Sequence, residues 1–224
     1  MENTTANKFL ILIQHPEKAR FLVSEQIKNV GLIGAILLDL AYEKCIEIEN
    51  GKLIVKSNHT RLSETHNKIL EELRNSSRIR KIKNWINRFI RKVRKYQKEL
   101  LIELERKEFV SLEHKKFLGI RYYKCSLVNA SMRNGLIEDL RALVFSNKDI
   151  TNEDALMLSL VDACKMYKII CKDRKEIKLC RKRLKEIVEL NLISEGVDKV
   201  IKEMQTVVIA AVMASTVTAT AGSN

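Results

Sequence analysis

The sequence has little proline, glycine or aromatic residue, and this scarcity narrows the folds that it can adopt. One Pro and seven Gly occur in 224 residues, and aromatic residues make up 5% of the chain. Because Pro and Gly mark most turns and loops, their rarity favours helices and argues against long irregular linkers. Apolar residues make up 46% and charged residues 31%, as in ordinary folded domains. The composition therefore predicts a folded, helix-rich chain.

Sequence signatures of catalysis, metal binding and membrane crossing are also absent. The four His lack the HExxH spacing, and no P-loop, GxGxxG or GxSxG motif occurs. The five Cys form no CxxC pair, which favours reduced, mostly buried thiols over disulfides or a zinc site. The apolar stretches 30–41 and 207–214 are too short to cross a bilayer, and no secretory signal opens the chain. We expect a cytoplasmic protein that is not an enzyme and holds no cofactor and no metal.

Apolar periodicity and turn signals predict the fold class: mainly α, a single globular helical domain with two β-hairpin insertions. Asn50–Gly51 supplies the positive φ angles of a tight turn, which predicts a hairpin over 45–55. A second hairpin is expected in 109–125, with its turn near 114–116. Helices are expected over 5–14, 18–29, 31–43, 63–75, 76–107, 129–145, 151–170, 172–191 and 195–215.

Several polar residues predict local contacts that hold helix ends in place. Ser63 is expected to begin a helix, and Thr151 with Asp154 has the spacing of a capping box. Asp39 and Asp162 lie inside apolar helices, where an unpaired carboxylate is costly. We expect each carboxylate to bind a neighbouring helix end or an arginine.

The segment 78–98 has ten Lys or Arg and no acidic residue, and its apolar positions from Ile79 to Leu104 recur every three or four residues. This spacing predicts one helix face packed on a core. A second basic segment, 172–185, has eight basic and two acidic residues. In the first segment the four residues at i, i+3, i+4 and i+7 share an exposed face. They are Arg91, Arg94, Lys95 and Lys98.

Like charges at this spacing repel each other, and no acid alternates with them. Three interpretations of the basic face stay open at this point: a solvated surface, a nucleic-acid contact that releases counterions, and a contact with anionic lipid head groups.

The order of several segments resembles the Golgi phosphoprotein 3-like family. GLIGAILLDLAYEKCIEIENGKLIV (31–55) is similar to its core helix and following hairpin, and the Trp-containing stretch 82–110 to its long basic helix. SLEHKKFLGIRYY (111–123) resembles its exposed hairpin. DALMLSLVDACKMYKIIC (154–171) and RKRLKEIVEL (181–190) resemble two of its later helices. The similarity runs in a consistent order through most of the chain.

This resemblance implies one mainly α-helical domain over 1–224, with an ordered core over about 5–215 and a disordered tail at 216–224. It also implies a non-enzymatic adaptor on the cytoplasmic side of a membrane, bound peripherally to anionic phospholipid and, in eukaryotic members, to phosphatidylinositol 4-phosphate. The hairpin 111–123 would contact the membrane or a second copy of the chain, and the protein cargo is unknown. The Lys-, Ile- and Asn-rich composition favours a divergent bacterial member. A nucleic-acid-binding helical protein is the alternative.

This sequence keeps only one of the residues that form the phosphoinositide pocket in the family. Arg94 matches one of its two helical Arg, whereas Gln97 stands at the other. Ser24 and Ile33 stand where the family has a Trp and a further Arg. The sequence therefore predicts less selective attraction to anionic lipid. The predicted lipid-binding residues are Arg91, Arg94, Lys95 and Lys98, and the predicted membrane or oligomer hairpin residues are Lys115, Lys116, Phe117 and Leu118.

Overall fold

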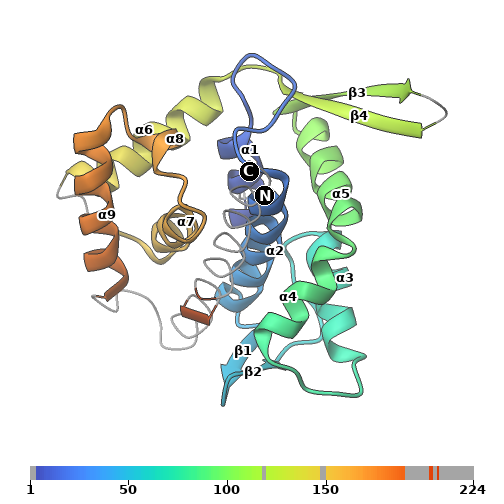
Figure 1. Cartoon of the computed structure of the whole chain (residues 1–224). Helices are drawn as coiled ribbons and strands as arrows, with labels where there is room; N and C mark the ends of the chain where they lie inside the picture. The colour runs from blue at the N-terminus through green and yellow to red at the C-terminus, as the bar shows by residue number, and fades with distance from the viewer. Residues whose placement is uncertain (1–3, 118–119, 147–149, 190–201, 204–205, 207–224) are drawn as a thin grey trace, which may run out of the picture.

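The computed structural model describes residues 4–117, 120–146, 150–189, 202–203 and 206. Helices form 61% of it, and the described residues contain nine helices and two antiparallel strand pairs. The expected mainly α fold with two hairpin insertions is therefore confirmed (Figure 1). The elements are α1 (Thr5–Ile13), α2 (Glu25–Tyr42), β1 (Ile46–Glu49), β2 (Lys52–Val55), α3 (Glu64–Arg74), α4 (Ile82–Ile90), α5 (Val93–Arg106), β3 (Val110–Phe117), β4 (Ile120–Leu127), α6 (Ser131–Phe145), α7 (Asn152–Ala163), α8 (Tyr167–Ile170) and α9 (Arg174–Glu189).

Helix α2 is the centre of the core. It is apolar almost all round and is buried along most of its length, as helices enclosed by other helices are. In Figure 1, α3–α5 lie on one side of α1 and α2, and α6–α9 lie on the other. Helix α1 packs so closely on α2 that a Cβ at Gly31 would lie 2.5 Å from Cζ of Phe9. Only a glycine fits at this crossing.

The predicted helix over 18–29 is wrong for 18–24, whereas 25–29 form the first turns of α2. The chain after Pro16 is bent, and the backbone N–H of Leu22 donates to Ile13 O at 2.7 Å, which ties it back to α1. The side chain of Ser24 accepts the N–H of Ile27 and so begins α2 at Glu25. Local turn and cap bonds therefore outweigh the helical spacing of 18–24.

The predicted continuous helix over 76–107 is also wrong, because two helices occupy this stretch. Helix α4 begins at Ile82, six residues after the expected cap at Ser76, and Ile79 is 64% exposed. A short turn then separates α4 from α5 at 91–92. The side chain of Lys92 binds Glu72 of α3 at 2.8 Å. Both helices keep their apolar faces on the core, so the periodicity conceals the break.

The two hairpins differ in how well they were predicted. The β1–β2 turn is Asn50–Gly51, with φ of 51° and 71°, as expected. In the second hairpin, β3 and β4 pair from Val110↔Leu127 to Phe117↔Ile120. The predicted turn near 114–116 is therefore wrong, because those residues are part of β3, which runs on to Phe117.

The last helices also depart from their predicted limits. The predicted helix over 151–170 is interrupted after Ala163 and continues as the short α8. Its start is confirmed, since Thr151 and Asp154 form the expected capping box. The predicted helix over 172–191 is present as α9. The predicted helix over 195–215 and the predicted tail at 216–224 lie outside the described residues, apart from 202–203 and 206.

Candidate functional site

An open cleft of about 990 Å³ lies between α5 and the β3–β4 hairpin, and we call it the basic cleft. Its walls come from four parts of the chain: residues 19–21, the first turns of α2, one face of α5, and both hairpin strands. The volume is in the range of small-molecule and headgroup pockets. The lining residues are Ala19, Arg20, Phe21, Glu25, Lys28, Arg94, Lys95, Gln97, Lys98, His114, Tyr122, Tyr123, Lys124 and Cys125.

Positive charge dominates the basic cleft, because six cationic side chains meet one carboxylate. Glu25 pairs with Lys28 at 2.7 Å. The other five cations form no ion pair with an acid in the described part of the chain: Arg20, Arg94, Lys95, Lys98 and Lys124. Like charges brought together in this way repel each other unless an anion from outside neutralises them.

Aromatic and amide groups form the deeper wall of the cleft. The Nζ of Lys28 lies 4.7 Å from the ring centroid of Phe21, a cation–π distance. Burial raises the pKa of the Tyr123 hydroxyl, and the nearby charge of Arg94 opposes that rise. Gln97 is 4% exposed and lines the same cleft. The cleft therefore combines buried or half-buried groups that can form hydrogen bonds with exposed cations.

Three of the four predicted basic residues line the cleft. Arg94, Lys95 and Lys98 are exposed on α5 and point to it. Arg91 does not line it, because it ends α4 at the turn before α5. Its expected place on the same continuous helix face depended on the unbroken helix that the structure lacks.

Of the predicted hairpin residues, Lys115 and Lys116 do not line the cleft. Lys115 forms an ion pair with Glu113 on the same strand. Lys116 is exposed on β3, and Phe117 ends that strand. Leu118 lies outside the described residues. Their predicted role in membrane contact or self-association stays a prediction.

Sequence reasoning missed half of the cleft's cations. Arg20, Lys28 and Lys124 are isolated basic residues in three separate segments, and only the fold brings them to α5. Ser24 and Ile33, which the resemblance aligns with two pocket residues of the family, do not line the cleft. Ser24 caps α2, and Ile33 is fully buried in the core. Within the cleft itself, Lys28 provides a cation and Phe21 an aromatic ring.

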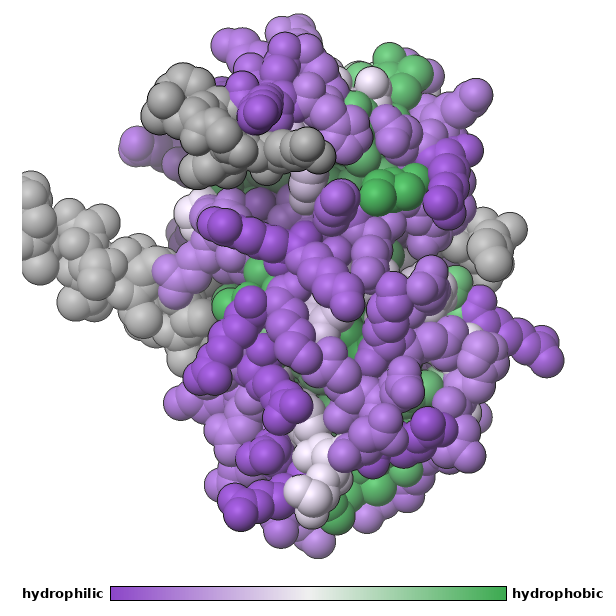
Figure 2. Space-filling view, turned by 90° about the vertical axis from the view of Figure 1, so that its right-hand side faces the viewer, coloured by the Kyte–Doolittle hydropathy of each residue, from purple (hydrophilic) through white to green (hydrophobic). Residues whose placement is uncertain are grey.

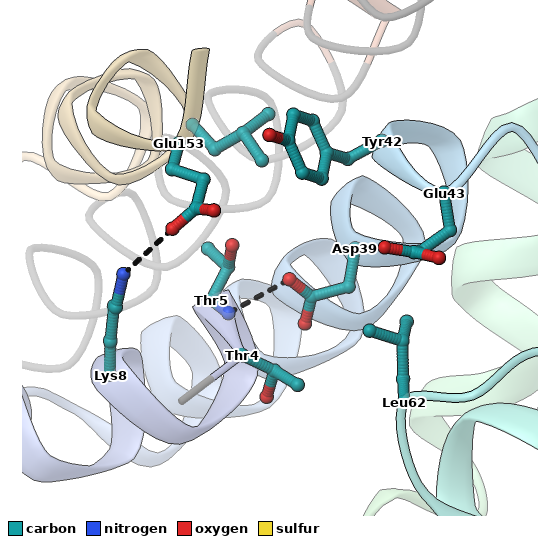
Figure 3. Close-up of a pocket in the computed structure, with 9 residues that line it drawn as sticks. Thr4, Thr5, Lys8, Asp39, Tyr42, Glu43, Leu62 and Glu153 are labelled. Carbon is teal, nitrogen blue, oxygen red and sulfur yellow. Dashed lines mark hydrogen bonds and ion pairs between the residues drawn. The ribbon is translucent and has the colours of Figure 1, made fainter. Parts of the chain in front are cut away.

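A second polar cluster surrounds Asp39 and is built differently. Its carboxylate accepts the N–H groups of Thr5 and Ala6 at 2.8 and 3.0 Å, at the first turn of α1 (Figure 3). It also lies 3.0 Å from Nε2 of His66, whose side chain is fully buried. The expectation that Asp39 binds a neighbouring helix end is confirmed. Asp162 instead accepts the hydroxyl of Tyr167.

The order Ser63–His66–Asp39 resembles a catalytic relay, but its geometry is that of a structural cluster. Ser63 lies 2.6 Å from Nδ1 of His66 and caps α3 by accepting the backbone N–H of His66. The cavity beside Asp39 has a volume of about 60 Å³, room for a few waters. No group of three or more acids, His and Cys that could hold a metal ion occurs in the described ranges.

The surface around α5 fits a contact with polar, charged material. Figure 2 faces the side of the molecule on which α5 lies in Figure 1, and hydrophilic residues cover most of it. Within the part of the chain that the structure describes, no helix has the length and apolar character to cross a bilayer.

The fold and the cleft define a class of protein: mainly α-helical, with a projecting β-hairpin and a cationic cleft at its base. A model of the Golgi phosphoprotein 3 (GPP34) family matches residues 6–204. Because this match spans most of the 224 residues, the chain belongs to the Golgi phosphoprotein 3 family. A search of curated proteins finds no match to the chain.

Proposed function

We propose that this protein binds anionic lipid head groups in the basic cleft and acts as a non-enzymatic adaptor at a cytoplasmic membrane surface. Membership of the Golgi phosphoprotein 3 family supports a lipid-associated adaptor role. The observation that carries the proposal is the convergence of five unpaired cations on one cleft. A phosphate group supplies the missing negative charge and accepts several charge-assisted hydrogen bonds.

Each element of the cleft has a part in this binding. Arg94 and Lys98, one turn apart on α5, hold the phosphate from one side, and Lys124 approaches from the hairpin. Lys28 is nearly buried, and Glu25 and Phe21 hold its ammonium group in one position. It therefore orients the bound phosphate. The β3–β4 hairpin, including Lys115–Leu118, then lies against the membrane or a second copy of the chain.

The test is co-sedimentation with vesicles at low and high salt, using neutral vesicles, vesicles with phosphatidylserine, and vesicles with phosphatidylinositol 4-phosphate at matched charge. The wild-type chain should bind both charged sets, more weakly at high salt. The double variant Arg94→Glu/Lys98→Glu should weaken binding about 30-fold or more, since each basic residue near such a surface contributes about 1 kcal/mol. The matched control, Lys175→Glu/Lys178→Glu on the exposed face of α9, has the same charge change and should bind normally.

Lipid identity is tested by Lys28→Met, which keeps the apolar stem and removes the positioned cation. If the cleft recognises a phosphoinositide, this variant should lose the preference for phosphatidylinositol 4-phosphate and keep its binding to phosphatidylserine. Equal binding of the Arg94→Glu/Lys98→Glu variant and the wild type would contradict the site. Binding of duplex DNA or RNA in place of vesicles would replace the lipid proposal with the nucleic-acid alternative.

A further inference from the structure

A smaller pocket of about 300 Å³ lies between β2 and the stretch that joins α3 to α4, and we call it the edge pocket. Leu53, Leu73 and Trp85 supply apolar surface, and Arg74 and Arg78 supply charge. It shares no lining residue with the basic cleft. In Figure 1 the β1–β2 hairpin and the β3–β4 hairpin lie at opposite ends of the molecule, so the two sites face different surroundings.

Two buried hydrogen-bond donors beside the edge pocket have no acceptor. Trp85 is 1% exposed and its Nε1 is unpaired, as is Nε of Arg80, whose guanidinium carbon lies 5.8 Å from the Trp85 ring centroid. The other unpaired buried side-chain atoms in the described residues are amide oxygens. A buried donor without a partner costs about 1–3 kcal/mol, so natural proteins rarely leave two together. What this place lacks is an acceptor.

The wall of the edge pocket also carries unpaired positive charge, which indicates a negatively charged partner. Arg74 and Arg78 are exposed on it and form no ion pair with any acid in the described ranges. Guanidinium groups bind carboxylates through two parallel hydrogen bonds. Ile79, 64% exposed, adds apolar surface at the rim. The pocket therefore combines a site for an acid with a site for an apolar side chain.

The backbone of β2 adds a third kind of complementarity. Lys56 N donates to Cys45 O at 2.8 Å on the β1 side, whereas Leu53 N donates to Arg80 O at 3.0 Å on the other side. Because an antiparallel ladder alternates in this way, the N–H of Val55 and the C=O of Leu53 also point away from β1. No backbone group in the described residues pairs with them. Residues 80–81 already pair with the start of this edge, at Lys52 and Leu53 N, and the rest of it, from Leu53 C=O to Val55 N–H, can accept an added extended segment.

We propose that the edge pocket binds an extended acidic peptide, in which a carboxylate side chain stands next to an aliphatic or aromatic one. The peptide backbone pairs with Leu53 and Val55 as an added strand. Its carboxylate is held by Arg74 and Arg78, and its apolar side chain packs on the exposed Ile79, in the pocket that Trp85 lines. Added strands gain affinity from backbone bonds and specificity from side-chain pockets, which is the division of roles seen here.

Trp85 provides a direct test, because it is the only Trp in the sequence. The full chain is titrated with a pool of acetylated peptides that alternate Asp with Val, Leu or Ile, and with a matched pool in which Asn replaces every Asp. The acidic pool should change Trp85 emission saturably, and the Asn pool should need at least about tenfold higher concentration, because the charge-assisted contacts are lost. No emission change with the acidic pool, or an equal one with both pools, overturns the proposal.

Variants separate the parts of the site. Arg74→Ala/Arg78→Ala should weaken the acidic pool at least about tenfold, whereas Lys175→Ala/Lys178→Ala on α9 should leave it unchanged. Val55→Pro removes the outward N–H at an edge position that tolerates proline, and should also weaken binding. Far-ultraviolet circular dichroism checks that each variant is folded. Wild-type affinity in the arginine variant overturns the acid site, and wild-type affinity in Val55→Pro overturns strand addition.

Two further titrations decide between sources of negative charge. Inorganic phosphate and phosphatidylserine vesicles should leave Trp85 emission unchanged at concentrations that match the peptide's charge. If phosphate reproduces the saturable change, the edge pocket is a small-anion site and the peptide assignment is wrong. If only the vesicles do, the pocket belongs to a membrane contact, and the proposal fails in the same way.

Discussion

Asp39 and Arg94 are both charged side chains on helices, but their surroundings are opposite in burial and in pairing. Asp39 is buried, and three donors from α1 and α3 surround its carboxylate. Arg94 is exposed on α5, next to other cations and without an acidic partner in the described residues. A paired, buried charge contributes to the fold, whereas a group of unpaired cations costs stability, and the lipid-binding role that we propose would explain such a group. The following tests exploit this difference.

The largest effect is expected at Asp39. Asp39→Ala leaves the N–H groups of Thr5 and Ala6 and the ring of His66 without an acceptor, inside the core. Breaking such a buried group should lower the free energy of unfolding by about 3–5 kcal/mol, measured by urea denaturation. Glu43→Ala is the control, because Glu43 lines the same small cavity, is exposed and should cost no more than about 0.5 kcal/mol. Similar losses in both variants would contradict the role of Asp39.

A smaller loss of stability is expected at Gly31, where α1 and α2 cross through apolar contacts alone. Gly31→Ala places a Cβ 2.5 Å from Cζ of Phe9 and 3.0 Å from Sγ of Cys164, so the core must shift, at a cost of about 1–3 kcal/mol. Gly135→Ala in α6 is the matched control, because nothing lies within 4 Å of its Cβ. It should raise stability by up to about 1 kcal/mol through helix propensity. Thermal and urea unfolding compare the two variants. If both substitutions changed the free energy of unfolding in the same direction, the α1–α2 crossing would be looser than described.

The Arg141–Glu176 pair lies between the two extremes, paired but partly exposed. Arg141 donates two hydrogen bonds to Glu176, at 2.7 and 2.9 Å, and so ties α6 to α9. These bonds, with the backbone N–H of Lys172, lower the pKa of Glu176 to about 2. Because the folded pKa is lowered, the pair contributes stability above the carboxyl's ordinary pKa and loses it as the pH falls towards 2. Glu176→Gln should therefore be less stable than wild type at neutral pH and lose less stability on acidification.

This prediction is checked by urea midpoints at neutral pH and near pH 3. Glu153→Gln is the comparison variant, because Glu153 forms a partly exposed pair with Lys8 and none with Arg141. If Glu176→Gln keeps the full acid sensitivity of the wild type, other carboxylates are responsible for it.

The sequence predicted those features that depend on neighbouring residues. The Asn50–Gly51 turn, the Ser63 cap and the Thr151–Asp154 capping box follow from local chemistry, and each is confirmed. The apolar spacing of α4 and α5 correctly predicted one buried face. It could not reveal the turn at 91–92, since two helices separated by a short turn can keep the same spacing.

The basic cleft could be predicted only in part, because its walls come from distant segments. Arg94, Lys95 and Lys98 stand out in the sequence as members of a dense basic run. Arg20 and Lys28 are single residues in unremarkable stretches, and their place beside α5 depends on how α2 packs in the core. Tertiary packing determines this set, and periodicity along one helix carries no information about it.

The smallest effect on stability is expected in the basic cleft itself. Arg94→Glu replaces a repulsion with Lys98, four residues on, by an attraction in the favourable Glu-to-Lys order along α5. The free energy of unfolding should therefore stay the same or rise by about 0.2–0.5 kcal/mol, while binding to anionic vesicles falls. Urea denaturation and vesicle co-sedimentation on one preparation test both effects. A loss of stability similar to that of Asp39→Ala would mean that Arg94 has a partner within the fold, and that the cleft's cations are part of the fold and not of a binding site.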